Sequence, residues 1–421
     1  MSETKPGELR RDLRLTDAIG IGLGAIIGAG IFVVTGVAAG VGGPAFLVGL
    51  FLAGVVATFN ALSSAQLAAT YPQSGGTYEY GYQVLNPWLG FAAGWVFLIS
   101  KLAAAGTVAL GFAGYFTALF PLVPERVVAM SAAIILTVVN YFGIRRTGLL
   151  NTAIVLISVA ALTYFIIAGI PSFNQENLKP FAPQGWRGVL ESTALLFFAY
   201  TGYARLATLG EEVHEPKKTI PKAIIWALGI AAVLYLGVAL IAVASVGAEA
   251  MAATRSPLEV AARTFELPGV VLAVSIGAAT AMLGVLLSQI LGISRMVFAM
   301  ARRKDLPKVF DHIHPAYGVP DLGILLAGFV AVLVVLLGTF EAVLAAAAFT
   351  ILIYYSIANL AAFRMRKEDK LFPNWIPVAG FLTCVFLAAT LPLSVIASGL
   401  GLLAAGFVWR AVYKRWVEKH S

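Results

Sequence analysis

The residues best placed to bind a ligand are the glycines of the stretch Gly20 to Gly36, which reads GIGLGAIIGAGIFVVTG. The stretch lies inside an apolar run from Ala18 to Val41, and roughly 20 apolar residues are enough to cross a bilayer. Glycine inside a helix costs about 1 kcal/mol relative to alanine, so a plain membrane anchor would not need this run. Close packing of neighbouring helices is one reason for the glycines, and an unwound backbone that a ligand can approach is the other. The second reason predicts two half-helices that meet near Ile27, Gly28, Ala29, Gly30 and Ile31.

A second interruption is expected in the apolar range 187–209. This range lies five apolar ranges after the first one, so the two cross the membrane in opposite directions. Interrupted spans at matching places of two oppositely oriented halves indicate an inverted-repeat transporter. Free N–H groups suit a carboxylate and free carbonyls suit an ammonium group, so such a pair fits a zwitterion; aromatic core packing is the alternative. The residues at this interruption are Phe198, Ala199, Tyr200, Thr201, Gly202 and Tyr203.

The composition is that of a membrane protein with several spans. Of 421 residues, 60% are hydrophobic and 12% are charged, about half the charged fraction of a soluble domain. The single cysteine, Cys384, excludes an intrachain disulfide, and no metal or other cofactor is expected. About twelve apolar ranges predict transmembrane helices, at 16–40, 44–69, 87–116, 124–143, 147–170, 187–209, 219–246, 268–300, 320–338, 342–363, 374–391 and 393–412.

The distribution of basic residues predicts the orientation. Most of the 29 Lys and Arg residues lie in the N-terminal tail and in alternate connecting segments, which the positive-inside rule places in the cytoplasm. Both termini are then cytoplasmic, and the protein is a multi-pass component of the cytoplasmic (inner or plasma) membrane. The net charge of +8 follows from this topology, so no nucleic-acid partner is expected. Segment 70–86 is expected to form an ordered re-entrant turn or a plain loop, and segment 247–267 a short amphipathic helix over the outer face.

Four stretches resemble those of the amino acid–polyamine–organocation permeases. They are GAIIGAGIF, YPQSGGTYEYGY, FFAYTGYARLATLGEEVHEPKKTIPKAI and SRMVFAMARRKDLPKVF, in the order and spacing of that family. The resemblance implies an all-α leucine-transporter-type fold, with two inverted five-helix repeats, helices 1 and 6 broken, and two additional helices. The chain then divides into a cytoplasmic tail (1–15), a ten-helix core (16–365) and a part with two helices and a short cytoplasmic tail (366–421).

The resemblance also implies a binding site at the two breaks. Gly28, Ala29 and Gly30 would give N–H groups to the substrate carboxylate, while Ile27 and the carbonyls near Phe198 and Ala199 would meet the α-amine. Phe198 is placed as a lid over the substrate, and Tyr203 is expected nearby.

Two positions depart from the family pattern. Many relatives carry a lysine in the fifth span as a built-in cation, and this chain has Ser158 there, whose hydroxyl could ligate sodium. Relatives that take dibasic substrates can place a carboxylate just past the second break, where this chain has Ala204 and Arg205.

Several ionisable residues are candidates for coupling or gating. Lys101 lies about fourteen residues into its span, roughly 20 Å along the helix and near mid-membrane, where such residues usually mark a transport path. It is expected to carry a proton, replace a cation or contact an anion; a lysine bound to backbone carbonyls for structure is the alternative. Arg205 and Glu211 form either a cytoplasmic gate pair or a solvated ion pair, and Glu191 is either a gate or an interfacial residue.

These observations predict a secondary transporter of amino acids in the lipid bilayer. Neutral amino acids are favoured, because neither break has an Asp or Glu nearby to pair a second buried ammonium group. Proton coupling is favoured over sodium coupling or exchange, and transport of other amino acids or amines is the alternative. A membrane-embedded enzyme would need a catalytic cluster, and none is recognisable; a nutrient sensor would usually add a long soluble tail. The sequence does not determine the oligomeric state.

Overall fold

The computed structural model describes residues 13–71, 75–143, 147–207 and 213–420. These residues are helical throughout apart from turns and one bridge between Leu13 and Val213. The first half of the chain forms α1 (Leu15–Ile26), η1 (Gly30–Val34), α2 (Thr35–Gly42), η2 (Gly43–Ala45), α3 (Phe46–Thr70), α4 (Thr77–Tyr80), η3 (Gly81–Leu85), α5 (Pro87–Leu119), α6 (Glu125–Tyr141), α7 (Thr147–Gly169), η4 (Ile170–Ser172) and η5 (Gln175–Leu178).

The second half begins with the other broken helix and ends with two helices outside the expected core. Its elements are α8 (Gly185–Tyr200), η6 (Thr201–Tyr203), α9 (Ala204–Ala207), α10 (Pro216–Ala252), α11 (Pro257–Ala262), α12 (Val270–Arg302), η7 (Lys308–Phe310), α13 (Asp321–Leu337), α14 (Phe340–Arg364), η8 (Lys367–Asp369), α15 (Trp375–Thr390) and α16 (Leu393–His420).

Helices occupy each of the twelve predicted apolar ranges. Seven helical stretches in the described part of the chain are long and apolar enough to cross a membrane, and the first of them, Leu15–Thr70, covers two predicted ranges. The apolar helices α13 and α15 are shorter. The main difference from prediction is α16, which continues to His420 where a separate tail was expected after residue 412. Basic residues near a helix C-terminus favour its dipole, and Lys414, Arg415 and Lys419 lie there.

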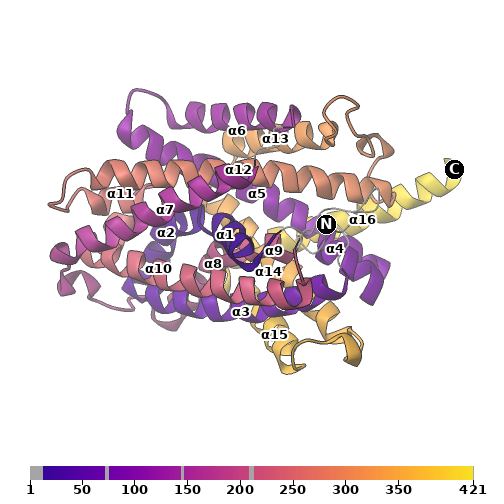
Figure 1. Cartoon of the computed structure of the whole chain (residues 1–421), viewed down its shortest axis with the longest axis horizontal. Coiled ribbons are helices and arrows are strands. Elements are labelled where there is room, and N and C mark those ends of the chain that lie inside the picture. Colours follow the sequence, from indigo (N-terminus) through magenta and orange to yellow (C-terminus); the bar gives the residue numbers. More distant parts are fainter. Residues whose placement is uncertain (1–12, 72–74, 144–146, 208–212, 421) are drawn as a thin grey trace.

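The long helices run roughly parallel to the longest axis of the molecule (Figure 1). The C-terminal part of α16 projects at one end of the bundle, which we call the termini end, and α11 lies toward the other, which we call the cap end. In the segment expected to be a re-entrant turn or loop, the described residues form α4 and η3, with residues 77–81 buried. The short helix expected within 247–267 is α11.

Local signals explain several helix boundaries. Helix α5 begins at Pro87 because the side-chain oxygen of Asn86 accepts hydrogen bonds from the Trp88 and Leu89 amides at 3.0 and 2.9 Å. Helix α10 is interrupted at Gly247, whose φ of 81° is a left-handed conformation that glycine adopts readily. Two further interruptions, between α1 and η1 and between α8 and α9, lie within residues 15–42 and 185–207.

Candidate functional site

The first interruption lies where the glycine run predicts it. Helix α1 ends with a hydrogen bond from the Ile27 amide to the Leu23 carbonyl, at 2.8 Å, and Ile27 itself is extended (φ −72°, ψ 112°). The next backbone bond runs from the Phe32 amide to the Gly28 carbonyl, at 3.3 Å, and η1 is a π-helix. Between these two bonds lie the amides of residues 28–31, at the start of the second half-helix, where N–H groups lack intrahelical partners. These amides can bind an anion such as a carboxylate.

The second interruption contacts the first directly. A Cβ atom on Gly30 would overlap Ala199, and a Cβ atom on Gly202 would overlap the carbonyl of Ala25. The glycines therefore allow both backbones to approach, so close packing and an unwound backbone are both present here. Gly28 differs from Gly30: a Cβ atom there would lie 2.8 Å from one methyl group of Val285, a side chain that can move.

The carbonyls of the second interruption are not equally free. The Phe198 carbonyl accepts hydrogen bonds from both the hydroxyl (2.9 Å) and the backbone amide of Thr201. The Thr201 carbonyl accepts from the Tyr355 hydroxyl at 3.3 Å. A carbonyl oxygen has two lone pairs, so the Phe198 oxygen is already satisfied. Of the two carbonyls predicted to meet the α-amine, that of Phe198 is therefore occupied, and the role of the Ala199 carbonyl stays a prediction.

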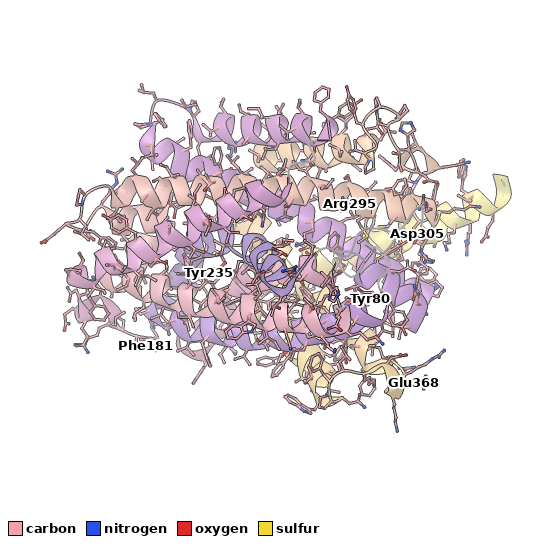
Figure 2. The ribbon with its side chains drawn as sticks, viewed as in Figure 1. Tyr80, Phe181, Tyr235, Arg295, Asp305 and Glu368 are labelled. Carbon is pink, nitrogen blue, oxygen red and sulfur yellow. The ribbon has the colours of Figure 1, made fainter. Side chains whose placement is uncertain are left out.

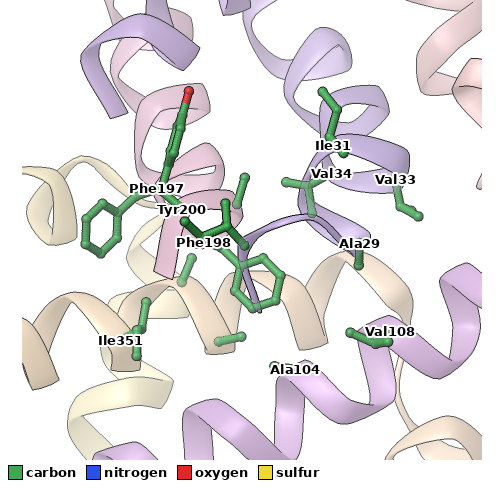
Figure 3. Packing of buried hydrophobic residues seen from close by; sticks show 14 of the residues in the cluster. Ala29, Ile31, Val33, Val34, Ala104, Val108, Phe197, Phe198, Tyr200 and Ile351 are labelled. Atoms are coloured by element: carbon green, nitrogen blue, oxygen red, sulfur yellow. The ribbon is translucent and has the colours of Figure 1, made fainter. Parts of the chain in front are cut away.

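The aromatic residues of the second interruption point in different directions. Phe198 lies beside the segment that carries Ala29, above the part of α5 that carries Ala104 and Val108 (Figure 3). Tyr200 points away, since its hydroxyl donates to the Leu50 carbonyl of α3 at 3.3 Å. Phe198 is thus the aromatic residue that lies between the first interruption and α5.

Tyr203 and Ile31 are buried beside the two interruptions. Tyr203 is fully buried against Tyr355, with ring centres 5.4 Å apart. Ile31 is fully buried within η1. Both side chains contribute to packing around the interruptions.

Lys101 lies half-buried in α5, with its ammonium 5.7 Å from the centre of the Phe97 ring. No hydrogen bond or ion pair of Lys101 occurs within the ranges that the structure describes, so the alternative of a lysine bound to carbonyls has no support. Ser158 is buried in α7 and donates to the Ile154 carbonyl at 2.8 Å. The other carbonyl near its hydroxyl, at 3.4 Å, belongs to Gly277 of α12 and not to α1.

The remaining candidates are less defined. Glu191 is half-buried in α8, about two turns before Phe198. Arg205 lies in the short helix α9. Glu211 lies outside the described residues, so the suggested gate pair stays a prediction.

Two tyrosines that the sequence did not single out hold the first interruption in place. The Tyr235 hydroxyl of α10 donates to the Ile26 carbonyl at 2.8 Å, and the Tyr115 hydroxyl of α5 donates to the Phe32 carbonyl at 2.6 Å. Both side chains are fully buried. The available signal was a hydroxyl group inside an otherwise apolar range, which must find a partner once it is buried.

A cavity of about 610 Å³ opens at the cap end. Arg255 and Glu125 form an ion pair across it at 2.8 Å, with both side chains about one-third exposed. The lining also includes Gly114 and Thr117 of α5 and Glu341 of α14. Ser256, Glu259 and Arg263 also line it, so the cavity reaches α11.

The termini end holds a buried charged group that we call the Asp305 cluster, made of Asp305, Tyr78, Tyr82, Arg410 and Lys414. Asp305, labelled in Figure 2, is fully buried, and one of its oxygens accepts from Tyr78 at 2.8 Å and from Tyr82 at 2.5 Å. Its other oxygen lies 3.8 Å from Arg410 and 3.9 Å from Lys414, both of α16. Burial, and with it the nearby Asp305 carboxylate, raises the pKa of the Tyr78 and Tyr82 hydroxyls, so both remain donors.

Known proteins resemble this chain over nearly its whole length. Residues 17–416 match the model of the family described as amino acid permease. An uncharacterized transporter of Mycobacterium tuberculosis is 41% identical over 95% of this chain and 91% of its own length. The methylthioribose transporter of Bacillus subtilis is 31% identical over all of this chain and 96% of its own, and a branched-chain amino acid permease of the same organism is 28% identical over 98% and 94%.

The family match covers both interruptions, the Asp305 cluster and most of α16. A multi-pass membrane protein follows from this match together with the apolar helices. The relatives named above are described as transporters or permeases. This chain belongs to the amino acid permease family, within the amino acid–polyamine–organocation transporters.

Proposed function

We propose that the protein is a secondary transporter that carries a neutral amino acid across the cytoplasmic membrane by alternating access. The observation that carries the proposal is the close packing of the two interruptions, where a Cβ atom on Gly30 would overlap Ala199, so that the amides of residues 28–31 and the Ala199 carbonyl belong to neighbouring segments. The amides would bind the carboxylate and the carbonyl the ammonium group, as half-helix ends do in transporters with inverted repeats. We further propose twelve crossings in two inverted five-helix repeats plus two helices, with both termini cytoplasmic.

The choice of a neutral substrate rests on where acidic residues are missing from the sequence around the interruptions. Within the described residues, ranges 18–71 and 192–207 contain no Asp or Glu, so a second ammonium group bound at the interruptions would lack a partner there. A branched-chain amino acid permease among the relatives fits this choice. Cationic amino acid transporters are also relatives, at 30% identity over 74% of this chain for one from Arabidopsis thaliana, so cationic substrates are the second candidate.

The substrate is tested by uptake of labelled compounds into liposomes that contain the purified protein. Leucine, alanine and phenylalanine are compared with arginine, putrescine and methylthioribose, with proton and sodium gradients imposed in turn. We expect uptake of at least one neutral amino acid. Uptake of arginine or putrescine at micromolar concentration, with none of the neutral amino acids, would overturn the neutral assignment.

We propose that Lys101 carries the coupling proton, because this half-buried residue is expected near mid-membrane and makes no ion pair with any residue that the structure describes. Lys101→Ala should then abolish uptake driven by a pH gradient while sparing exchange of internal for external substrate. The matched control is Lys179→Ala, a lysine 64% exposed and paired with Glu176. If sodium is the coupling ion, Ser158→Ala should raise the sodium requirement. Proton-driven accumulation that survives intact in Lys101→Ala would exclude the lysine as carrier.

A further inference from the structure

We propose that the Tyr115 hydroxyl is a latch that holds α11 closed over the first interruption. Tyr115 is then a positioning residue for transport, since it links the segment expected to bind the carboxylate to a movable cap. The inference rests on the proposed function in treating α11 as the gate of the transport path and residues 28–31 as the carboxylate site. The contact itself, and the experiment below, do not require transport to be measured.

The latch is one hydroxyl that joins three elements. It donates to the Phe32 carbonyl of η1 at 2.6 Å and accepts from the Leu258 amide of α11 at 3.3 Å. Tyr115 belongs to α5, so the three partners come from separate parts of the chain. The Phe32 ring also packs edge-on against the Tyr115 ring, with centres 6.0 Å apart, and both residues are fully buried.

Helix α11 depends on the Tyr115 hydroxyl because the N-cap residue of the helix, Ser256, does not accept a hydrogen bond from its first amides. Ser256 precedes the helix but makes no side-chain hydrogen bond to its first-turn amides; its hydroxyl contacts the Glu259 carboxylate at 3.2 Å. The first amides of a helix need acceptors from outside the helix when they are buried. For Leu258 that acceptor is Tyr115, so lifting α11 breaks this bond.

The second hydrogen bond of Tyr115, to the Phe32 carbonyl, depends on the conformation of the first interruption. Phe32 lies two residues after Gly30, within the π-helix η1, and π-helical turns are often found at functional sites. A ligand that binds the amides of residues 28–31 orders the turn that carries the Phe32 carbonyl. The hydroxyl of Tyr115 can therefore relay occupancy of the site to the cap.

Next to Tyr115, α5 packs closely against the segment that leads into α11. A Cβ atom on Gly114 would lie 2.9 Å from the Cβ atom of Arg255, so glycine allows α5 to approach the start of α11. The cavity at the cap end is lined by Gly114 and Arg255. Tyr115, the next residue along α5, is fully buried, so the latch lies below the layer that the cavity exposes.

The experiment measures how fast the underside of α11 becomes accessible. Ala261 is fully buried on α11, and Ala261→Cys is made together with Cys384→Ala so that it is the only thiol. The purified protein in detergent is treated with a water-soluble maleimide, with and without Tyr115→Phe. Loss of the hydroxyl removes two hydrogen bonds, and labelling should become roughly tenfold faster.

The matched control is Thr117→Val. It removes a hydroxyl of the same helix that donates to the Ala113 and Gly114 carbonyls of α5 itself, so the labelling rate should stay unchanged.

General unfolding is distinguished with the native thiol. Cys384 is fully buried between α3 and α14, so it reports loss of structure and not movement of α11. In Tyr115→Phe without the Ala261 substitution, Cys384 should be labelled as slowly as in the unchanged protein. Equal labelling of Ala261→Cys with and without the Tyr115 hydroxyl would overturn the latch, as would a parallel increase at Cys384. Failure of the neutral-substrate proposal would affect neither rate.

Discussion

The cap end and the termini end of the molecule are held together by different chemistry. At the cap end, one tyrosine hydroxyl bonds two backbone groups, and a partly exposed ion pair joins Arg255 to Glu125. At the termini end, the fully buried carboxylate of Asp305 accepts from two tyrosine hydroxyls and lies within 4 Å of two cations. Neutral hydrogen bonds contribute about 0.5–1.5 kcal/mol each, whereas breaking a buried ion pair costs about 3–5 kcal/mol.

This difference indicates which end can move. A cap whose hydrogen bonds to the rest of the bundle are neutral, and whose ion pair to α6 is partly exposed, can open at a rate that transport requires, because lids and gates need low local stability. The Asp305 cluster instead fixes η3 and α16 to the loop after α12, and Arg410 also donates to the Pro87 carbonyl at the start of α5. We therefore infer that α16 braces the termini end and that α11 is the movable part.

The largest effect is expected from Asp305→Ala. It leaves the Arg410 side chain, 3% exposed, without its counter-ion, and leaves the Tyr78 and Tyr82 hydroxyls without their acceptor. The free energy of unfolding should fall by about 3–5 kcal/mol, seen as a marked loss of thermal stability in detergent. Asp311→Asn, at a carboxylate 31% exposed in the loop that follows, is the control and should change little. Equal stability of the two variants would contradict the role of the cluster as a brace.

The next effect separates packing from binding at the interruptions. Gly30→Ala places a Cβ atom on Ala199 and should cost about 1–3 kcal/mol of stability, as overpacking does. Gly28→Ala meets only a methyl group of Val285, so it should keep the melting temperature and weaken substrate binding. The measurement is thermal unfolding alongside substrate titration. If Gly28→Ala binds substrate normally, the substrate does not approach the backbone at Gly28, and this residue does not belong to the site.

The smallest effect is expected at the outer ion pair. Glu125→Gln removes a partly exposed partner of Arg255, and such pairs contribute about 0–1 kcal/mol. Labelling of Ala261→Cys should therefore increase less than it does in Tyr115→Phe, and the increase should shrink at high salt. A larger increase in labelling from Glu125→Gln than from Tyr115→Phe would show that the ion pair, and not the tyrosine hydroxyl, is the main contact that holds the cap.

The sequence predicted the features that depend on local composition. The apolar ranges gave the helices, and the residues around Gly28 and Gly202 gave both interruptions, because glycine weakens a helix wherever it lies. The contact of Gly30 with Ala199 could not be predicted, since it depends on how two distant helices pack.

The two contacts that distinguish the ends are also non-local. Tyr115 lies 83 residues from Phe32 and 143 from Leu258 along the chain. Tyr78 lies 227 residues from Asp305, whose motif indicated only the family. A hydroxyl or carboxylate in a near-apolar segment signals that a partner exists, and only the fold identifies the partner.

The central claim is that the amides of residues 28–31 bind the carboxylate of a neutral amino acid. The most direct measurement compares the affinity of the purified protein for leucine and for leucinamide, which keeps the amine and side chain but lacks the carboxylate. If leucine is a substrate, the amide should bind about 10- to 150-fold more weakly, as expected for loss of hydrogen bonds to a charged group. Equal affinity for the two compounds would contradict the claim, as would binding of methylthioribose without binding of any amino acid.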